Sequence, residues 1–278
     1  MQQQERLAWL IDALIAEDAR LQAARTAGEL AVPSAPDERY ALYRSLVNVR
    51  PPQPAPEGYL EVEDAYLQQA TRERGIVTLA DVRADASARA GDDALLLWRG
   101  DITRLALDAI VNAANEQLLG CFVPCHGCID NAIHTAAGLR LRRACDRLMR
   151  AQGTPEPPGR AKLTPGFNLP AGHVLHTVGP IVGGAGPSER DCELLASCYR
   201  ACLDLAAQHE LASVAFCSIS TGEFHFPKER AAAIATRTVC SWQREREQDG
   251  LPVPAVVFDV FSHDDEAIYQ RALEDIDE

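Results

Sequence analysis

The sequence has few basic residues and no long hydrophobic run, and each absence excludes a class of partner. Its 27 Lys and Arg residues are outnumbered by 40 Asp and Glu residues, so the formal net charge is −13. A protein that binds nucleic acid generally needs a basic surface to displace counterions from phosphates. No apolar run approaches the length of a membrane-spanning helix. We therefore expect neither nucleic acid nor a membrane as a partner.

A secretory signal pattern is also lacking at the start of the sequence. The first residues, MQQQERLAWLIDALIAEDAR, carry charges throughout and have the spacing of an amphipathic helix. Cysteine, in contrast, is plentiful: there are nine, an odd number, and several lie close to one histidine. That pattern favours metal binding in a reducing compartment over a disulfide framework. We therefore expect a cytoplasmic protein.

The chain length of 278 residues fits either one large domain or one domain of ordinary size with an extension. Up to residue 90, three segments have apolar residues at helical spacing, with Tyr40 and Tyr66 on their apolar faces, and we find no strand pattern. From Ala94, apolar runs alternate with helical stretches, which is typical of an α/β layer fold. We predict a helical N-terminal extension over residues 1–90 and an α/β domain over residues 91–278.

Within the second region, the pattern predicts both strands and helices. The predicted strands span residues 95–98, 109–112, 173–178, 214–218 and 255–261. The predicted helices span residues 129–152, with an interruption near Gly138, and residues 189–209, 228–247 and 264–276.

The stretch LLGCFVPCHGCIDNAIH, residues 118–134, concentrates the residues that can bind a metal. Cys121, Cys125, His126 and Cys128 fall within eight residues on a turn-rich loop, and thiolates with imidazole are typical zinc ligands. Cys125 and His126 are neighbours and would reach one ion awkwardly, so we expect Cys121, His126 and Cys128 to be the ligands. Three protein ligands leave one position open, as in catalytic zinc sites. Reduced cysteines packed as small hydrophobic residues are the alternative.

Four further positions indicate a site for an anionic ligand. Asp130 lies on the first turn of a predicted helix, where the helix dipole favours anions. Three loops follow predicted strands at their carboxyl ends, where open α/β sheets place ligands. These loops contain Asp101, residues 112–115, and residues 218–227, whose small residues can present backbone N–H groups to a phosphate. Each alone is equally well explained by turn or cap residues, but together they converge on one end of one sheet.

Four motifs carry a resemblance to a known family. They are GDI at residues 100–102, VNAAN at 111–115, IHTAAG at 133–138 and ISTG at 219–222. From about Ala94 to the C-terminus the sequence resembles the macrodomain family of ADP-ribose binders, whose fold is a mixed sheet sandwiched between helices. In hydrolytic members a glycine run usually precedes the Asp at the helix start, and here GCFVPCHGCID replaces it. This replacement resembles the zinc-dependent subgroup, protein-ADP-ribose hydrolases often encoded beside a sirtuin-type ADP-ribosyltransferase. The NVRPP segment at 48–52 and the helices before it are also similar to that subgroup's N-terminal extension.

The resemblance implies a role for each matching residue. Asp101 would accept a hydrogen bond from the adenine amino group, and the backbone of Ile102 would lie beside the adenine. Asn115 would contact the distal ribose, and Asp130 would lie beside its anomeric carbon. Phe261 matches the aromatic residue that packs on adenine in some members. The residues that would wrap the diphosphate are Ser220, Thr221, Gly222, Glu223 and Phe224.

The reaction that the resemblance implies is hydrolysis of the bond between C1 of the distal ribose and a protein side chain. One Zn²⁺ per chain would act as Lewis acid, with Asp130 as general base and Asn115 beside it. The implied partners are ADP-ribose, a mono-ADP-ribosylated protein such as a lipoyl-carrier protein, and a sirtuin-type transferase. Two alternatives are a reader that binds ADP-ribosylated protein without cleaving it and an interaction module, each with a structural zinc. Simple recognition does not need a carboxylate at the scissile carbon, so Asp130 and Asn115 favour cleavage.

Two further expectations concern parts of the chain with no assigned chemistry. His134 faces either the pocket or the core, and a lone helical histidine is more often packed in the core. The loops assigned to the ligand all lie beyond Ala94, so a protein lacking about the first 90 residues is expected to keep ADP-ribose binding.

Overall fold

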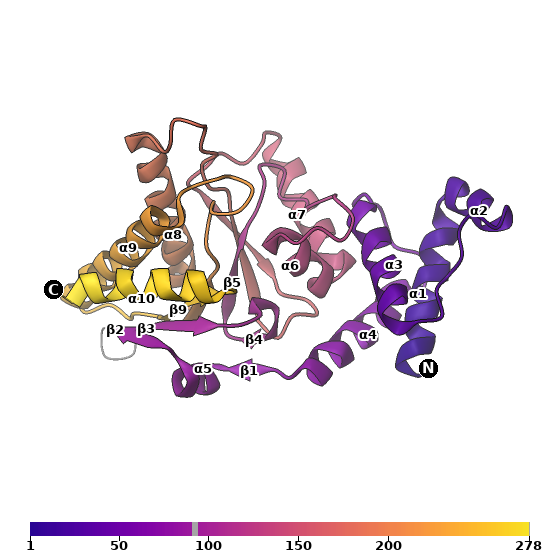
Figure 1. Cartoon of the computed structure of the whole chain (residues 1–278), viewed down its shortest axis with the longest axis horizontal. Helices are drawn as coiled ribbons and strands as arrows, with labels where there is room; N and C mark the ends of the chain where they lie inside the picture. Colours follow the sequence, from indigo (N-terminus) through magenta and orange to yellow (C-terminus); the bar gives the residue numbers. More distant parts are fainter. Residues whose placement is uncertain (91–93, 278) are drawn as a thin grey trace.

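A seven-stranded mixed sheet forms the centre of the structure, a computed structural model that describes residues 1–90 and 94–277 (Figure 1). In spatial order its strands are β2 (Ala88–Ala90), β3 (Leu95–Arg99), β9 (Ala255–Val260), β8 (Ser213–Phe216), β5 (Ala109–Ala113), β7 (His173–Thr177) and β6 (Ala161–Pro165). The five inner strands are mutually parallel, whereas β2 and β6 pair antiparallel at the two edges. The predicted mixed sheet is therefore confirmed.

Helices cover both faces of this sheet (Figure 1). They are α5 (Leu79–Asp85), α6 (Ile129–Ala137) and α7 (Leu139–Gln152) on one face, and α8 (Glu189–Gln208), α9 (Lys228–Gln248) and α10 (His263–Asp277) on the other. Leu95 and Leu97 pack with the second group, and Leu96 and Trp98 pack with the first. Because both faces are buried, β3 is a continuous apolar run instead of an alternating one.

The predicted elements of the α/β region are all present, with ends shifted by at most two residues for the strands. Gly138 separates α6 from α7, as the sequence indicated. The prediction that no strand precedes Ala94 was wrong, because Ala88–Ala90 pairs with β3 as an edge strand. A short Ala-Arg-Ala segment has little strand propensity, so tertiary pairing decides its conformation. The edge strand β6 and the two-stranded parallel sheet of β1 (Val77–Thr78) and β4 (Leu105–Ala106) were not predicted either.

The N-terminal helices form a separate group beside α6 and α7, at the end of the molecule away from the C-terminus (Figure 1). They are α1 (Gln3–Glu17), α2 (Ala19–Thr26), α3 (Pro36–Val49) and α4 (Tyr59–Arg74). Their apolar faces meet in a hydrophobic cluster of their own, to which α7 adds Leu139. The three predicted helices of the extension are therefore present as α1, α3 and α4.

A buried carboxyl group ties this helical group to the α/β layers. Glu63 of α4 is fully buried and accepts hydrogen bonds from the backbone N–H of Leu139 at 2.9 Å and the hydroxyl of Tyr43 at 3.0 Å. Leu139 is the first residue of α7, so Glu63 satisfies an N–H group that the helix itself leaves unpaired. Burial raises the pKa of Glu63 to about 7.

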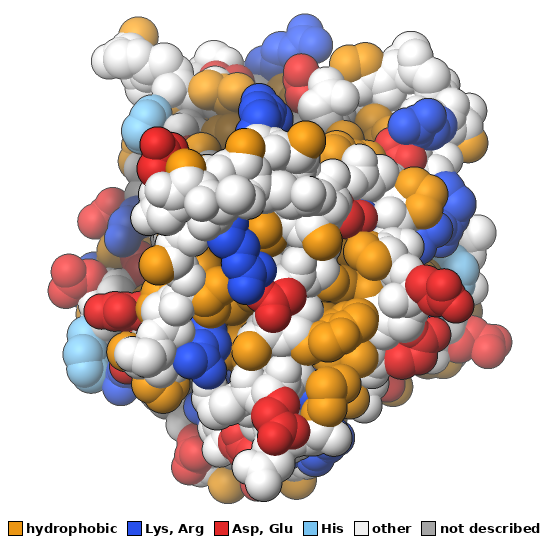
Figure 2. Space-filling view, turned by 90° about the vertical axis from the view of Figure 1, so that its right-hand side faces the viewer, with side chains coloured by type: hydrophobic (Ala, Val, Ile, Leu, Met, Phe, Trp, Pro, Cys, Tyr) orange, Lys and Arg blue, Asp and Glu red, His pale blue; other side chains and the backbone are white. Residues whose placement is uncertain are grey.

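The surface carries charges of both signs. Figure 2 shows one face of the molecule on which acidic and basic side chains are intermingled, with hydrophobic side chains gathered near its middle. Of the described helices, none combines the length and apolar composition that crossing a membrane requires.

Candidate functional site

An open cleft of about 1470 Å³ lies at the carboxyl ends of the parallel strands. The loops after β3, β5 and β8 line it, as expected for ligand sites of open α/β sheets. The residues that were given a metal-ligand, catalytic or ligand-binding role from the sequence line this one cleft: Asp101, Ile102, Asn115, Cys121, His126, Cys128, Asp130, Ser220, Thr221, Gly222, Glu223 and Phe224. The loops are far apart in sequence, so the parallel strand order brings them together.

Cys121, His126 and Cys128 form a group that can hold a metal ion. Their ligand atoms all lie within 4.8 Å of one another, and Cys121 Sγ is 3.7 Å from His126 Nδ1. Two thiols and an imidazole are a donor set that suits zinc. Burial, with a smaller contribution from Cys121, raises the pKa of the Cys128 thiol to about 12, so a bound cation would be needed to hold this sulfur as a thiolate. Cys125 lies outside the group: its exposed thiol donates to the carbonyl oxygen of Ala41.

Two backbone conformations shape the metal loop, defined here as residues 120–128. Gly120 has a φ of +82°, and a Cβ at this position would lie 2.8 Å from the His134 ring, so only glycine fits. Cys125 has a φ of +54°, a left-handed conformation that is uncommon for a residue with a side chain. These two residues turn the chain so that the candidate sulfur and imidazole ligands converge.

Asp130 lies on the cleft floor at the start of α6, with 5% of its surface exposed. Asn112 Nδ2 donates to its Oδ1 at 2.8 Å, and Asn115 Nδ2 lies 3.4 Å from its Oδ2. Burial raises the pKa of Asp130 to about 6. Cys128 is the N-cap of the same helix, and its sulfur accepts from Asn131 N–H at 3.4 Å. One helix start therefore holds both a candidate metal-binding thiol and the candidate catalytic carboxylate.

His134 is buried one turn after Asp130. Its Nε2 lies 3.5 Å from Asp130 Oδ1, and within the described chain neither ring nitrogen makes a hydrogen bond. Burial, and secondarily the neighbouring His176, lowers the pKa of His134 well below its ordinary value, so the ring is neutral. The core position expected for this histidine is the one that the structure shows.

The expected adenine end of the cleft holds two carboxyl groups. Asp101 accepts hydrogen bonds from Thr103 N–H at 3.0 Å and Thr103 Oγ1 at 2.6 Å, and it pairs with Arg74 at 2.9 Å. Asp259 of β9 also lines the cleft, and its buried Oδ1 has no hydrogen-bond partner among the described residues. Burial, followed by the charge of Asp101, raises the pKa of Asp259 well above its ordinary value. Phe261 lines the cleft and is 82% exposed.

The expected diphosphate loop runs from β8 toward the start of α9. The backbone N–H groups of Phe226 and Val182 donate to the carbonyl oxygens of Ser220 and Phe224, each at 2.9 Å, and fix the loop. A Cβ on Gly179 would come within 1.9 Å of Ser220 Oγ, so this glycine permits the close approach. The α9 N-terminus adds a favourable field for an anion.

The extension also contributes to the cleft wall, which the sequence did not indicate. Tyr40 and Arg44 of α3 and Tyr66 and Arg74 of α4 line it. A protein lacking about the first 90 residues would therefore lose part of the cleft wall, and its retention of ADP-ribose binding stays a prediction. Helical spacing marked Tyr40 and Tyr66 as parts of apolar faces, but it does not say which surface such a face meets.

The Macro domain family matches residues 111–235 of this chain. A relative from Treponema medium, named protein-ADP-ribose hydrolase, is 47% identical over 273 residues, which cover 98% of this chain and 100% of the relative. The chain belongs to the macrodomain family. A relative of the same name from Staphylococcus aureus (strain MSSA476) is 45% identical to this macrodomain, over 88% of each chain. The solved Oceanobacillus iheyensis macrodomain with ADP has a TM-score of 0.59 and 40% identity, covering 66% of this macrodomain and 90% of that chain.

Proposed function

We propose that this macrodomain hydrolyses the bond between C1 of the distal ribose of ADP-ribose and a protein side chain, and that it requires zinc to do so. The observation that carries the proposal is the start of α6. There a buried carboxyl group, Asp130, stands two residues from Cys128, one of three clustered zinc-type donors. Relatives at 47% and 45% identity that carry the name protein-ADP-ribose hydrolase support it.

In this proposal ADP-ribose lies along the cleft in one direction. Asp101 and the backbone at Ile102 would receive the adenine, because both lie at the end of β3. The loop of residues 220–224 would receive the diphosphate ahead of α9. The distal ribose would then lie next to Asn115 and Asp130, where bond cleavage takes place.

Asp130 would act as the general base that orients and deprotonates the attacking water. Asn112 and Asn115 each donate toward a different oxygen of its carboxylate, so the group is held in one orientation. Burial beneath the cleft keeps bulk water from competing for it. Cys121, His126 and Cys128 would hold the zinc ion, which when bound supplies Lewis acidity next to the scissile bond.

Metal analysis combined with a release assay tests the proposal. The full chain is purified, its zinc content measured, and the release of ADP-ribose from a protein modified on acidic residues is followed. We expect about one zinc per chain and release that stops on chelation and returns with zinc. Tight ADP-ribose binding without release would instead identify a reader, and undiminished release by zinc-free protein would exclude a role for the metal in the reaction.

Three finer assignments belong to the same proposal. Thiolate ligands need a reducing compartment, which supports a cytoplasmic location. The separate hydrophobic cluster of α1, α3 and α4 supports a division into an extension over residues 1–90 and a macrodomain with the metal loop over residues 91–278. From the sequence resemblance alone, we propose a lipoyl-carrier protein modified by a sirtuin-type transferase as the substrate. Assaying that protein beside an unrelated ADP-ribosylated protein tests the last assignment.

A further inference from the structure

Helix α3 of the extension contacts the metal loop through Arg44. Its Nη2 donates to the backbone carbonyl of His126 at 2.6 Å, and its Nε and Nη2 both donate to Asn131 Oδ1, at 3.0 and 2.7 Å. The rigid fork of a guanidinium group fixes the relative positions of its acceptors. Arg44 therefore holds the main chain of one candidate ligand residue and the first turn of α6 in one arrangement.

Asn131 extends this contact to the rest of the metal loop. Its side chain is fully buried, and its Nδ2 donates to the carbonyl oxygen of Val123 at 3.0 Å. Its backbone N–H donates to the sulfur of Cys128 at 3.4 Å. A displacement of Arg44 would thus also move a second candidate ligand, Cys128, because Asn131 contacts both residues.

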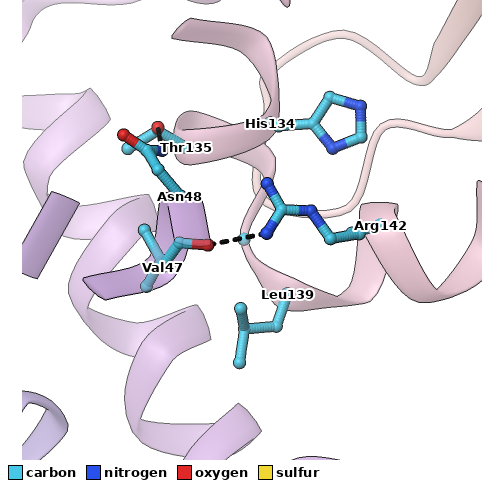
Figure 3. Close-up of a pocket in the computed structure, with 7 residues that line it drawn as sticks. Val47, Asn48, His134, Thr135, Leu139 and Arg142 are labelled. Atoms are coloured by element: carbon cyan, nitrogen blue, oxygen red, sulfur yellow. Dashed lines mark hydrogen bonds between the residues drawn. The ribbon is translucent and has the colours of Figure 1, made fainter. Parts of the chain in front are cut away.

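A second residue of α3, Asn48, supports the turn just before His126. Its Oδ1 accepts from the backbone N–H of Cys125 at 2.9 Å, and its Nδ2 donates to Thr135 Oγ1 at 3.1 Å. Figure 3 shows Asn48 reaching from α3 toward Thr135 on α6. Cys125 has a left-handed backbone conformation, and contacts with its surroundings must offset the free energy that this conformation costs. Asn48 is 1% exposed and thus provides a fixed acceptor for this strained turn.

The metal loop has little support of its own. Among the described backbone hydrogen bonds, the one with both ends inside residues 120–128 joins His126 N–H to the carbonyl oxygen of Val123, at 3.2 Å. Phe122 of this loop is 41% exposed. Arg142 of α7 stacks on the Phe122 ring and also donates to the carbonyl oxygen of Val47 on α3, a contact drawn in Figure 3. External contacts, several of them with α3, therefore determine the loop conformation.

We infer that α3 is a positioning element for the metal site, with Arg44 and Asn48 as the residues that hold the metal loop in its ligand-binding conformation. The inference rests on the zinc site proposed above. It assigns the extension a direct part in metal binding, because residues that orient metal ligands contribute to affinity without touching the ion.

Zinc affinity of the full chain tests this inference. Arg44→Ala and Asn48→Ala are compared with wild type by competition against a chromogenic chelator, and the absorption spectrum of the Co²⁺ form reports ligand geometry. Loss of a residue that orients a ligand typically lowers metal affinity by roughly 10- to 100-fold, which is the loss expected for Arg44→Ala. The Co²⁺ spectrum is expected to change as well.

Arg39→Ala is the matched control. Arg39 lies on the same helix, but its guanidinium group donates to the carbonyl oxygens of Pro33 and Ser34 inside the extension. We expect its zinc affinity and Co²⁺ spectrum to match wild type. Arg44→Lys keeps the charge but loses the fork, so it is expected to fall between wild type and Arg44→Ala. If Arg44→Ala does not fold, the zinc affinity of Arg44→Lys tests the inference in its place.

Amide hydrogen exchange on metal-free protein separates this inference from the zinc proposal. Faster exchange of residues 120–128 in the Arg44→Ala and Asn48→Ala variants than in Arg39→Ala supports positioning by α3. The inference would be overturned if the Arg44 and Asn48 variants had the same zinc affinity, Co²⁺ spectrum and loop exchange as wild type. The zinc proposal would then stay intact. Absence of zinc binding by wild type would remove the zinc proposal, whereas the exchange data would still decide whether α3 holds the loop.

Discussion

Asn112 Nδ2 lies 2.8 Å from Oδ1 of Asp130 and 3.2 Å from Nδ1 of His176. The amide nitrogen must donate, so His176 Nδ1 accepts, and the ring proton on Nε2 points to Thr164 Oγ1 at 2.9 Å. Burial lowers the pKa of His176 to about 3, which keeps the ring neutral and this hydrogen-bond direction fixed. The candidate catalytic carboxylate is thus oriented from beneath by a chain of buried polar groups.

Asn112→Ala is expected to lower kcat with little change in KM, because Asp130 loses the donor that orients it. Misplacement of a catalytic group by about 1 Å costs on the order of 10²-fold in rate. Stability is expected to fall by about 1 to 3 kcal/mol, since buried partners are left unpaired. Steady-state kinetics and urea unfolding measure both effects. An unchanged kcat in a folded variant would show that Asp130 does not depend on this contact.

Asp130→Ala is expected to retain zinc and fold while losing roughly 10²- to 10⁴-fold of its activity, the usual contribution of a general base. ADP-ribose release, zinc content and the melting temperature are measured on one preparation. Asp130→Asn, which keeps the shape but cannot accept a proton, should be as inactive. Activity within a few-fold of wild type in either variant would rule out the general-base role.

Cys128→Ala and chelator treatment are each expected to lower the rate of hydrolysis by several orders of magnitude. ADP-ribose binding and a near-native melting profile are expected to remain. Only an ion that acts in the reaction gives this result, because loss of a structural ion would remove fold and binding together. Cys125→Ala is the matched control, since this thiol lies outside the ligand group. It should keep zinc and activity. Parallel loss of melting transition and binding in Cys128→Ala would make the ion structural.

Asp101→Ala is expected to weaken ADP-ribose binding by about 0.5 to 1.5 kcal/mol, the contribution of one hydrogen bond. Its half-exposed ion pair with Arg74 adds little to stability. Calorimetry with ADP-ribose and with its hypoxanthine analogue distinguishes the causes, because the analogue lacks the amino donor. The variant should bind both ligands alike, whereas wild type prefers adenine. An unchanged affinity for ADP-ribose would place Asp101 outside the binding site.

Glu63 makes stability depend on pH. Its folded pKa of about 7 lies above the ordinary value of 4.5, so the folded state binds a proton that the unfolded chain has released. Stability is therefore expected to fall as pH rises from about 4.5 to 7, by roughly 3 kcal/mol. Glu63→Gln should flatten this slope at the cost of one hydrogen bond, and Glu61→Gln, exposed on the same helix, should not. Urea unfolding from pH 5 to 8 measures the slope, and equal slopes in all three proteins would contradict the assignment.

The sequence by itself determined the α/β alternation, the break at Gly138 and the composition of the metal loop. These features are local: helical and strand spacing is set within a few residues, and Cys121, His126 and Cys128 are close in the chain. The convergence of three loops also followed from the sequence, because parallel strands end at one edge.

Only the tertiary structure decided the contacts made over long sequence distances. Arg44 lies 82 residues before His126, the residue whose carbonyl oxygen it binds, and Asp259 follows Asp101 by more than half the chain. The edge strand β2 likewise forms because β3 offers unpaired backbone groups. Spacing along the chain shows which face of a helix is apolar or polar, but packing decides which surface that face meets. For this reason the sequence alone does not predict the contacts of Arg44 on α3 with His126 and Asn131.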